Sequence, residues 1–196
     1  MKRKSSLIRA ELPMILAWFY CAGLVIGTLY VNAQLKSENG YLAYYINSYL
    51  EDHFSGNFLS VFSISFLSVI MTHTLLLLLS LSCFSAPVIC LIPLFKGFVY
   101  GTISATLYMS YGLKGIIANV LLLWIPVVVQ SITLILFCGE SLTTSARLFR
   151  SALLHHSVHN AISVSKEFSR YVLYSTIGLS VAVLEGVFSM LLGSVF

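Results

Sequence analysis

Long runs of apolar residues constrain this chain more than any other feature. Several runs match the roughly 20 residues that an α-helix needs to cross a hydrocarbon layer of about 30 Å. Of its 196 residues, 58% are hydrophobic and 9% are charged, with a mean hydropathy of +0.92. Soluble proteins carry about 25% charged residues. The sequence therefore predicts an all-α, polytopic integral membrane protein.

We expect one membrane domain over residues 1–196, built from five transmembrane helices packed as a bundle. The apolar stretch 58–95 is too long for one span, and the serine-rich dip before Pro87 divides it, because proline suits the first turn of a helix. Pro126 is expected to kink the fourth helix. The expected helices cover residues 13–33, 58–82, 87–110, 116–138 and 171–195, with a polar connection at 34–57 and a polar segment at 139–170.

The distribution of basic residues predicts the orientation of the bundle. Lys36 and Lys114 fall on one side of the membrane, and Lys96 lies within it. The other basic residues precede the first helix or lie in segment 139–170: Lys2, Arg3, Lys4, Arg9, Arg147, Arg150, Lys166 and Arg170. Since Lys and Arg stay preferentially in the cytoplasm, the N-terminus and segment 139–170 are expected inside and the C-terminus outside a cell membrane.

Two segments leave alternatives open. The first apolar run could be a cleaved signal peptide ending near Ala33, although it is longer than a typical signal sequence. Within the outer connection, residues 41–50 carry apolar and tyrosine side chains at helical spacing. This pattern fits either a short interfacial helix or a loop whose tyrosines belong to an aromatic belt.

Small residues recur at four-residue spacing in three of the expected helices, which places them on one helical face and lets backbones approach closely. Contacts within the chain are the expected use, while one stripe could serve a partner helix or a homo-oligomer. The stripes are Gly23 and Gly27; Gly97, Gly101 and Ala105; and Gly178, Ala182 and Gly186.

Four polar side chains inside the spans are the candidate interaction residues: His73, Lys96, Gln130 and Glu185. Polar groups at this depth are costly and usually face the bundle interior. They indicate either a hydrogen-bonded core that fixes helix register or a midplane site for an ion or substrate. Glu185 is expected to face inward, with Lys96 as its first candidate partner and His73 as its second.

Other chemistry finds little support in the sequence. The four cysteines lie in or beside apolar runs without CxxC spacing, so neither disulfides nor a metal site is expected. His155, His156 and His159 lack the acidic and cysteine neighbours of a zinc site. No catalytic motif, cofactor-binding loop or nucleic-acid-binding stripe occurs, so we expect neither an enzyme nor a cofactor nor a nucleic-acid partner.

The central part of the chain resembles the stage II sporulation protein M family. The similarity rests on Pro87-Val88-Ile89, on Phe95-Lys96-Gly97-Phe98-Val99-Tyr100-Gly101 and on Gly112-Leu113-Lys114-Gly115, followed by Pro126 and Glu185. Family members often have Asn-rich positions where this chain has His73-Thr74, and glycines where it has Ser80, Ser82 and Cys83. The resemblance covers most of the chain.

That resemblance implies a bacterial membrane anchor or scaffold. In spore-forming bacteria the family holds a complex with two peptidoglycan-degrading partners, the stage II sporulation proteins D and P, during engulfment. The alternative is a small transporter or channel component that uses the polar residues at the midplane.

Overall fold

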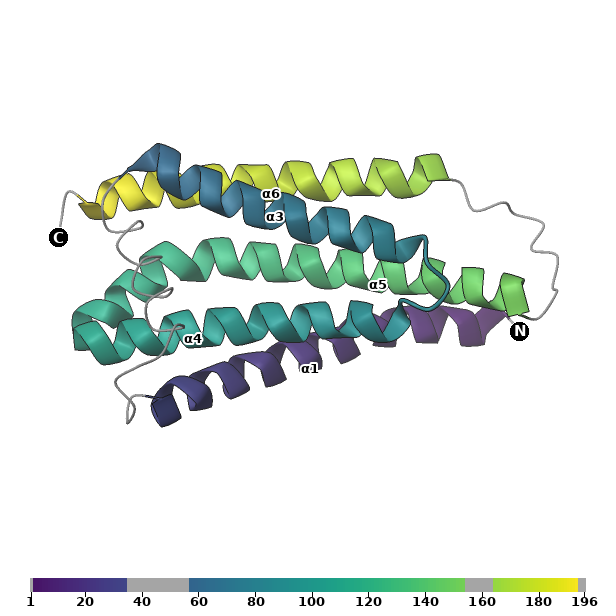
Figure 1. The fold of residues 1–196 in the computed structure, drawn as a ribbon, viewed down its shortest axis with the longest axis horizontal. Coiled ribbons are helices and arrows are strands. Elements are labelled where there is room, and N and C mark those ends of the chain that lie inside the picture. The colour runs from purple at the N-terminus through teal and green to yellow at the C-terminus, as the bar shows by residue number, and fades with distance from the viewer. Residues whose placement is uncertain (1, 35–56, 154–163, 194–196) are drawn as a thin grey trace.

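The computed structural model describes residues 2–34, 57–153 and 164–193, and all of their regular structure is helical (Figure 1). Five helices are long and apolar enough to cross a membrane, which confirms the predicted fold class. The segment 41–50 and the three histidines at 155, 156 and 159 lie outside the described residues. The elements are α1 (Lys2–Gln34), α3 (Phe58–Ser80), α4 (Ala86–Ala118), the π-helix η1 (Asn119–Trp124), α5 (Ile125–Leu153) and α6 (Val164–Gly193).

Three helices continue beyond the apolar runs at the end of the bundle that holds the N-terminus, here called the N-terminal end. α1 begins at Lys2 instead of residue 13, α5 ends at Leu153 instead of Cys138, and α6 begins at Val164 instead of Tyr171. Hydropathy locates the edge of the lipid, whereas a helix continues until its backbone hydrogen bonds are interrupted. The polar segment expected from residue 139 is therefore helical as far as Leu153.

Two irregularities accompany the turn from α4 into α5, one at Gly112 near the end of α4 and the other in the π-helix η1. Gly112 has φ 56° and ψ −129°, a conformation that glycine adopts without steric cost, and it forms the sharp turn. The π-helix Asn119–Trp124 ends two residues before Pro126, which is fully buried. Because proline has no N–H to donate, a wider helical turn ahead of it accommodates the missing bond. The expected distortion at Pro126 thus takes the form of a π-helix.

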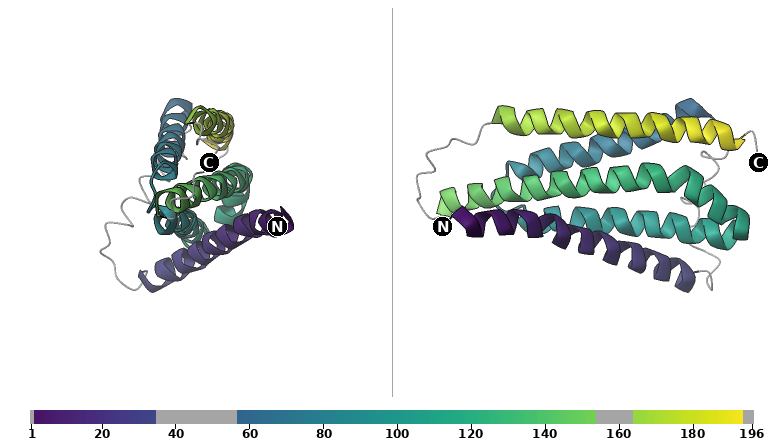
Figure 2. Two further views of the ribbon diagram at one scale, coloured as in Figure 1. Left: turned by 90° about the vertical axis from the view of Figure 1, so that its right-hand side faces the viewer. Right: turned by 180° about the vertical axis from the view of Figure 1, so that it is seen from behind.

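The bundle consists of two close helix pairs joined by α5. α1 packs along α4, α3 packs along α6, and α5 contacts all four of these helices (Figures 1 and 2). α1 and α4 run parallel, whereas α3 and α6 run antiparallel. α3 and α4 touch each other far less than they touch their own partners, although only a short turn joins them.

Glycines bring the backbones of α1 and α4 into contact. A Cβ atom added to Gly23 or Gly27 would collide with the carbonyl oxygen of Leu94 or Phe98. In return, a Cβ on Gly97 would collide with the carbonyl oxygen of Tyr20, and one on Gly101 with that of Leu24. Close backbone approach of this kind is the main source of helix packing in lipid. Two of the small-residue stripes therefore face each other.

The third stripe faces α3. Gly178 lies against the side chain of Val69, and Gly186 lies against the ring of Phe58, while Ala182 between them is completely buried. Large apolar side chains cover the outside of the bundle, where they suit contact with lipid. The innermost hydrophobic cluster comprises Leu16, Leu76, Ile89, Leu134, Phe137, Cys138 and Tyr174.

Candidate functional site

Glu185 of α6 is the centre of a polar group inside the bundle. Its side chain is directed inward, and the residue is only 4% exposed. Ser65 Oγ of α3 donates a short hydrogen bond to Glu185 Oε2, and Gln130 Nε2 of α5 donates to Glu185 Oε1 at 3.3 Å. Both carboxyl oxygens therefore have partners, and these partners come from two other helices.

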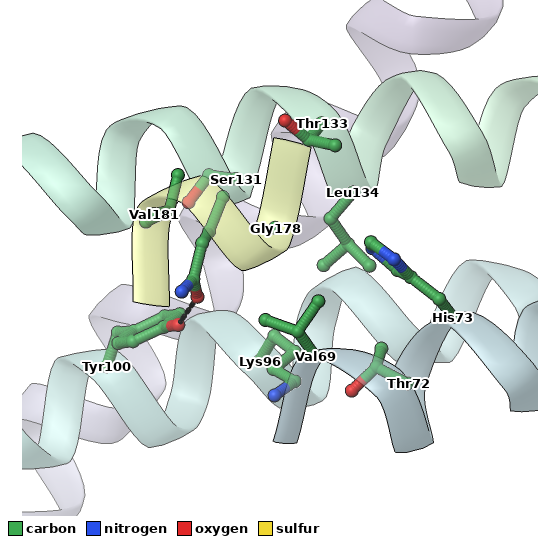
Figure 3. Close-up of a pocket in the computed structure, with 11 residues that line it drawn as sticks. Val69, Thr72, His73, Lys96, Tyr100, Ser131, Thr133, Leu134, Gly178 and Val181 are labelled. Carbon is green, nitrogen blue, oxygen red and sulfur yellow. Dashed lines mark hydrogen bonds between the residues drawn. The ribbon is translucent and has the colours of Figure 1, made fainter. Parts of the chain in front are cut away.

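Tyr100 extends this network to α4. Its hydroxyl donates to Gln130 Oε1 at 2.5 Å, the dashed line in Figure 3. We call Ser65, Tyr100, Gln130 and Glu185 the polar layer. It links α3, α4, α5 and α6 by side-chain hydrogen bonds, so it can hold the two helix pairs in a defined register.

Lys96 lies beside the polar layer but does not form the expected ion pair. Its ammonium donates to Ser68 Oγ of α3 at 2.8 Å, and no ion pair joins it to Glu185 in the described part of the chain. Neutral groups occupy both oxygens of Glu185, and Ser68 lies within direct reach of the lysine. Lys96 therefore acts on Glu185 through its charge and not through a direct ion pair.

His73 belongs to a separate contact on α3. It is 5% exposed, and its Nδ1 lies 3.4 Å from Ser175 Oγ of α6. The imidazole ring of His73 packs edge to face with the ring of Phe137 of α5, and the two ring centroids are 5.4 Å apart. His73 is eight residues from Ser65, which is about 12 Å along a helix. It therefore ties α3 to α6 away from Glu185 and is not the predicted second partner.

A small cavity separates Lys96 and His73 from the polar layer. Its volume is about 20 Å³, enough for one or two water molecules. Lys96 and Thr72 lie on its lower side in Figure 3, while Ser131 and Thr133 of α5 lie on its upper side. The cavity is lined by both polar and apolar side chains and lies between the two helix pairs.

A second polar cluster joins the C-terminal half of α5 to the first turns of α6, toward the N-terminal end of the bundle, and was not predicted from the sequence. Arg170 of α6 forms ion pairs with Glu167, at 2.7 Å from Nη1 to Oε1, and with Glu140 of α5, at 3.1 Å from Nε to Oε2. Thr144 Oγ1 also donates to Glu167 Oε1 at 3.0 Å. Glu167 is only 4% exposed. The sequence predicted only a polar cytoplasmic segment over residues 139–170 and no ion-pair cluster within it.

Replacing Arg170 with methionine is expected to destabilise the contact between α5 and α6. The change leaves Glu140 and the buried Glu167 without their cation, while the methionine stem preserves most of the packing. We expect a loss of about 1–3 kcal/mol in the free energy of unfolding, measured by thermal or denaturant unfolding in detergent. Lys166→Met is the matched control, because position 166 is exposed and takes no part in these ion pairs. Equal losses in both variants would contradict the assignment.

Among the described residues, no group of three or more His, Cys, Asp or Glu side chains could hold a metal ion. The four cysteines are free thiols, and Cys138 is part of the hydrophobic core. The described interior therefore offers hydrogen-bonded structural groups and a small cavity beside them.

The sequence matches the family model described as stage II sporulation protein M over residues 15–190. The chain belongs to the stage II sporulation protein M family. It is thus a multi-pass membrane protein of a sporulation family, and this family is not known as a family of enzymes. No curated protein and no solved structure matches the chain.

The residues that carry the family resemblance have two different environments in this stage II sporulation protein M relative. Gly97 and Gly101 face α1 in the closest backbone contact of the bundle, whereas Lys96 and Tyr100 face α3 and α5. Glu185 belongs to the same hydrogen-bonded layer, where it is joined to Tyr100 through Gln130. The family pattern therefore coincides with the contacts that join α4 to the other helices.

Proposed function

We propose that this protein is a non-enzymatic membrane scaffold that holds a peptidoglycan-degrading complex during spore engulfment. Membership of the stage II sporulation protein M family suggests the process, and the stage II sporulation proteins D and P are the implied partners. The observation that carries the proposal is the interior of the bundle. The side chains of the polar layer bond to one another, and the cavity beside them has room for only one or two waters.

A closed, hydrogen-bonded interior suits a protein that presents fixed surfaces to partners. Tight glycine contacts hold α1 against α4, and the polar layer joins that pair to α3 and α6 through α5. A scaffold needs such rigidity because its partners must be held in a constant geometry. The wide outer surface of exposed apolar side chains offers contact area to lipid and to transmembrane helices.

The proposed partners can be tested by affinity purification from sporulating cells of the source organism. A tagged full-length chain is expected to recover peptidoglycan hydrolases after mild detergent extraction. A tagged, unrelated five-span membrane protein expressed at the same level serves as the control. Recovery of an ATPase subunit in place of hydrolases would contradict the scaffold proposal and favour transport.

The proposed orientation places the N-terminus and the segment after Cys138 in the cytoplasm, with the C-terminus outside. It is supported by the basic residues that flank the N-terminal end of the bundle. A cysteine introduced at Arg147 of a cysteine-free variant should resist an impermeant thiol reagent in intact cells and react after permeabilisation. A cysteine introduced at Lys36 should react in intact cells. The reverse pattern would overturn the orientation.

Transport is the second candidate, and the cavity beside Lys96 favours it. A polar midplane site between two helix bodies is typical of small transporters. The cavity is small, and hydrogen bonds join the side chains of the polar layer beside it. Both observations argue against a continuous pathway for a solute through the bundle in this conformation. Ion or solute flux into proteoliposomes that depends on Lys96 and Glu185 would establish the transporter, whereas flux equal to protein-free vesicles is expected from the scaffold.

A further inference from the structure

The line along which α3 meets α4 differs from the other helix contacts in the bundle. We define the α3–α4 seam by Ser68, Met71 and Thr72 of α3 and by Phe95 and Lys96 of α4. The two helices make little contact here although a short turn connects them. Met71 and Phe95 are 67% and 63% exposed, and Ser68 is also exposed. The seam therefore opens toward the surface that faces lipid.

Lys96 places a positive charge in this seam near the middle of the membrane. It lies ten residues after Ala86, the first residue of its span, or about 15 Å along the helix. A lysine side chain reaches only about 6 Å, so the ammonium cannot extend to the headgroups. Its hydrogen-bond acceptor is the neutral hydroxyl of Ser68, and the described residues supply it with no ion pair. Charges at this depth are normally paired.

Within residues 2–34, 57–153 and 164–193, no exposed acid without a cation lies beside Lys96. Glu11 is the first residue of its span, and Glu140 and Glu167 form the ion-pair cluster with Arg170 toward the N-terminal end of the bundle. Glu185 is buried, and its two oxygens accept from Ser65 and Gln130. The remaining acidic residues, Glu38, Glu51 and Asp52, fall between the first two spans. The described part of a second copy therefore offers no free carboxylate for Lys96.

We propose that the α3–α4 seam is a docking groove for a transmembrane helix of another protein that carries a carboxylate near its midpoint. The carboxylate accepts hydrogen bonds from the Lys96 ammonium and forms with it the direct ion pair that the more distant, buried Glu185 does not form. Ser68 and Thr72 are small enough for a helix to approach closely, while Phe95 and Met71 enlarge the contact. This inference rests on the proposed scaffold function, because it names the kind of partner and the surface that holds it.

A synthetic helix provides a direct probe. The full-length chain, labelled with a donor dye in lipid vesicles, is mixed with acceptor-labelled leucine–alanine transmembrane peptides at low peptide-to-lipid ratio. One peptide carries a central glutamate, and its matched control carries leucine at that position. We expect energy transfer to show at least tenfold tighter association of the glutamate peptide. Lys96→Met should reduce this association to the level of the leucine peptide, whereas Lys114→Met should leave it unchanged.

Further variants keep the test decisive. Lys96→Arg retains the charge and should retain the preference, and Ser68→Leu fills the groove and should weaken binding while keeping the ammonium. If Lys96→Met fails to fold, as judged by size-exclusion chromatography, these two variants carry the test. Equal binding of the glutamate and leucine peptides to the unmodified chain would overturn the docking groove. Lys96-dependent energy transfer between two copies of this chain would assign the seam to self-association and would also overturn it.

The docking groove and the scaffold proposal can fail separately. If the unmodified chain and Lys96→Met recover the same hydrolases from cells, the groove is wrong and the scaffold stands. If the glutamate peptide binds in a Lys96-dependent manner but cells yield no hydrolase, the groove stands and the peptidoglycan-degrading complex is wrong. The peptide assay and the affinity purification therefore have to be read together on the same two variants.

Discussion

Replacing Gly97 and Gly101 together with leucine is expected to abolish accumulation of the protein in the membrane. Both glycines face the backbone of α1, where a single added Cβ would already overlap the carbonyl oxygens of Tyr20 and Leu24. Backbone atoms cannot rotate away as side chains do, so α1 would have to separate from α4. That pair has the most extensive helix contact in the bundle. The readout is the amount of folded protein by immunoblotting and size-exclusion chromatography.

Alanine at the same positions should also be destabilising. Each alanine is expected to cost about 1–3 kcal/mol, as overpacking does in a well-packed core. The matched control is Gly139→Ala, because a Cβ there would lie 3.8 Å from Pro13 Cγ, an ordinary contact. This control should be neutral or slightly stabilising, since alanine favours a helix over glycine. Normal accumulation of the double leucine variant would show that α1 does not pack on α4 in this way.

The fold could be predicted largely because lipid imposes simple rules on a sequence. Apolar length located the spans, and the serine-rich turn before Pro87 divides α3 from α4. The four-residue spacing of glycines indicated close contacts, but it could not say that Gly97 faces Tyr20. The spacing of glycines defines a face of one helix, whereas a contact depends on the depth in the membrane and the rotation of both helices. The end of α5 at Leu153 and the start of α6 at Val164 could not be predicted either, because no glycine or proline lies beside them.

The candidate site was only partly predictable for the same reason. Gln130 and Glu185 stood out because amides and carboxylates are rare in lipid. Ser65 and Ser68 did not, because serine is common in transmembrane helices and satisfies itself by bonding to its own backbone. A possible indication was the recurrence of polar residues on one face of α3, at 65, 68, 72 and 73. Direct partners require three-dimensional proximity, which hydropathy and charge do not encode.

Replacing Glu185 with leucine is expected to destabilise the bundle strongly. The change removes the acceptor for Ser65 Oγ and Gln130 Nε2 and leaves both donors in a nearly dry interior. Each buried group left without a partner costs about 1–3 kcal/mol. Glu185→Gln has almost the same shape and keeps one acceptor oxygen, so it should cost about 1 kcal/mol. Thermal unfolding of the purified chain in detergent measures both variants.

A pair of double-mutant cycles can then identify the partners of Glu185. Combining Glu185→Gln with Ser65→Ala should give a coupling energy of about 1 kcal/mol or more. Residues in direct contact typically show about 0.5–3 kcal/mol. Combining Glu185→Gln with Lys96→Met should give a smaller coupling, because Lys96 bonds to Ser68 and acts on Glu185 only through space. Lys114→Met, at the other end of α4, supplies the baseline and should be additive. If Lys96 coupled more strongly than Ser65, a direct ion pair would exist in the membrane. The polar layer would then be organised around the charge pair that the sequence suggested, with Ser65 and Gln130 in secondary positions.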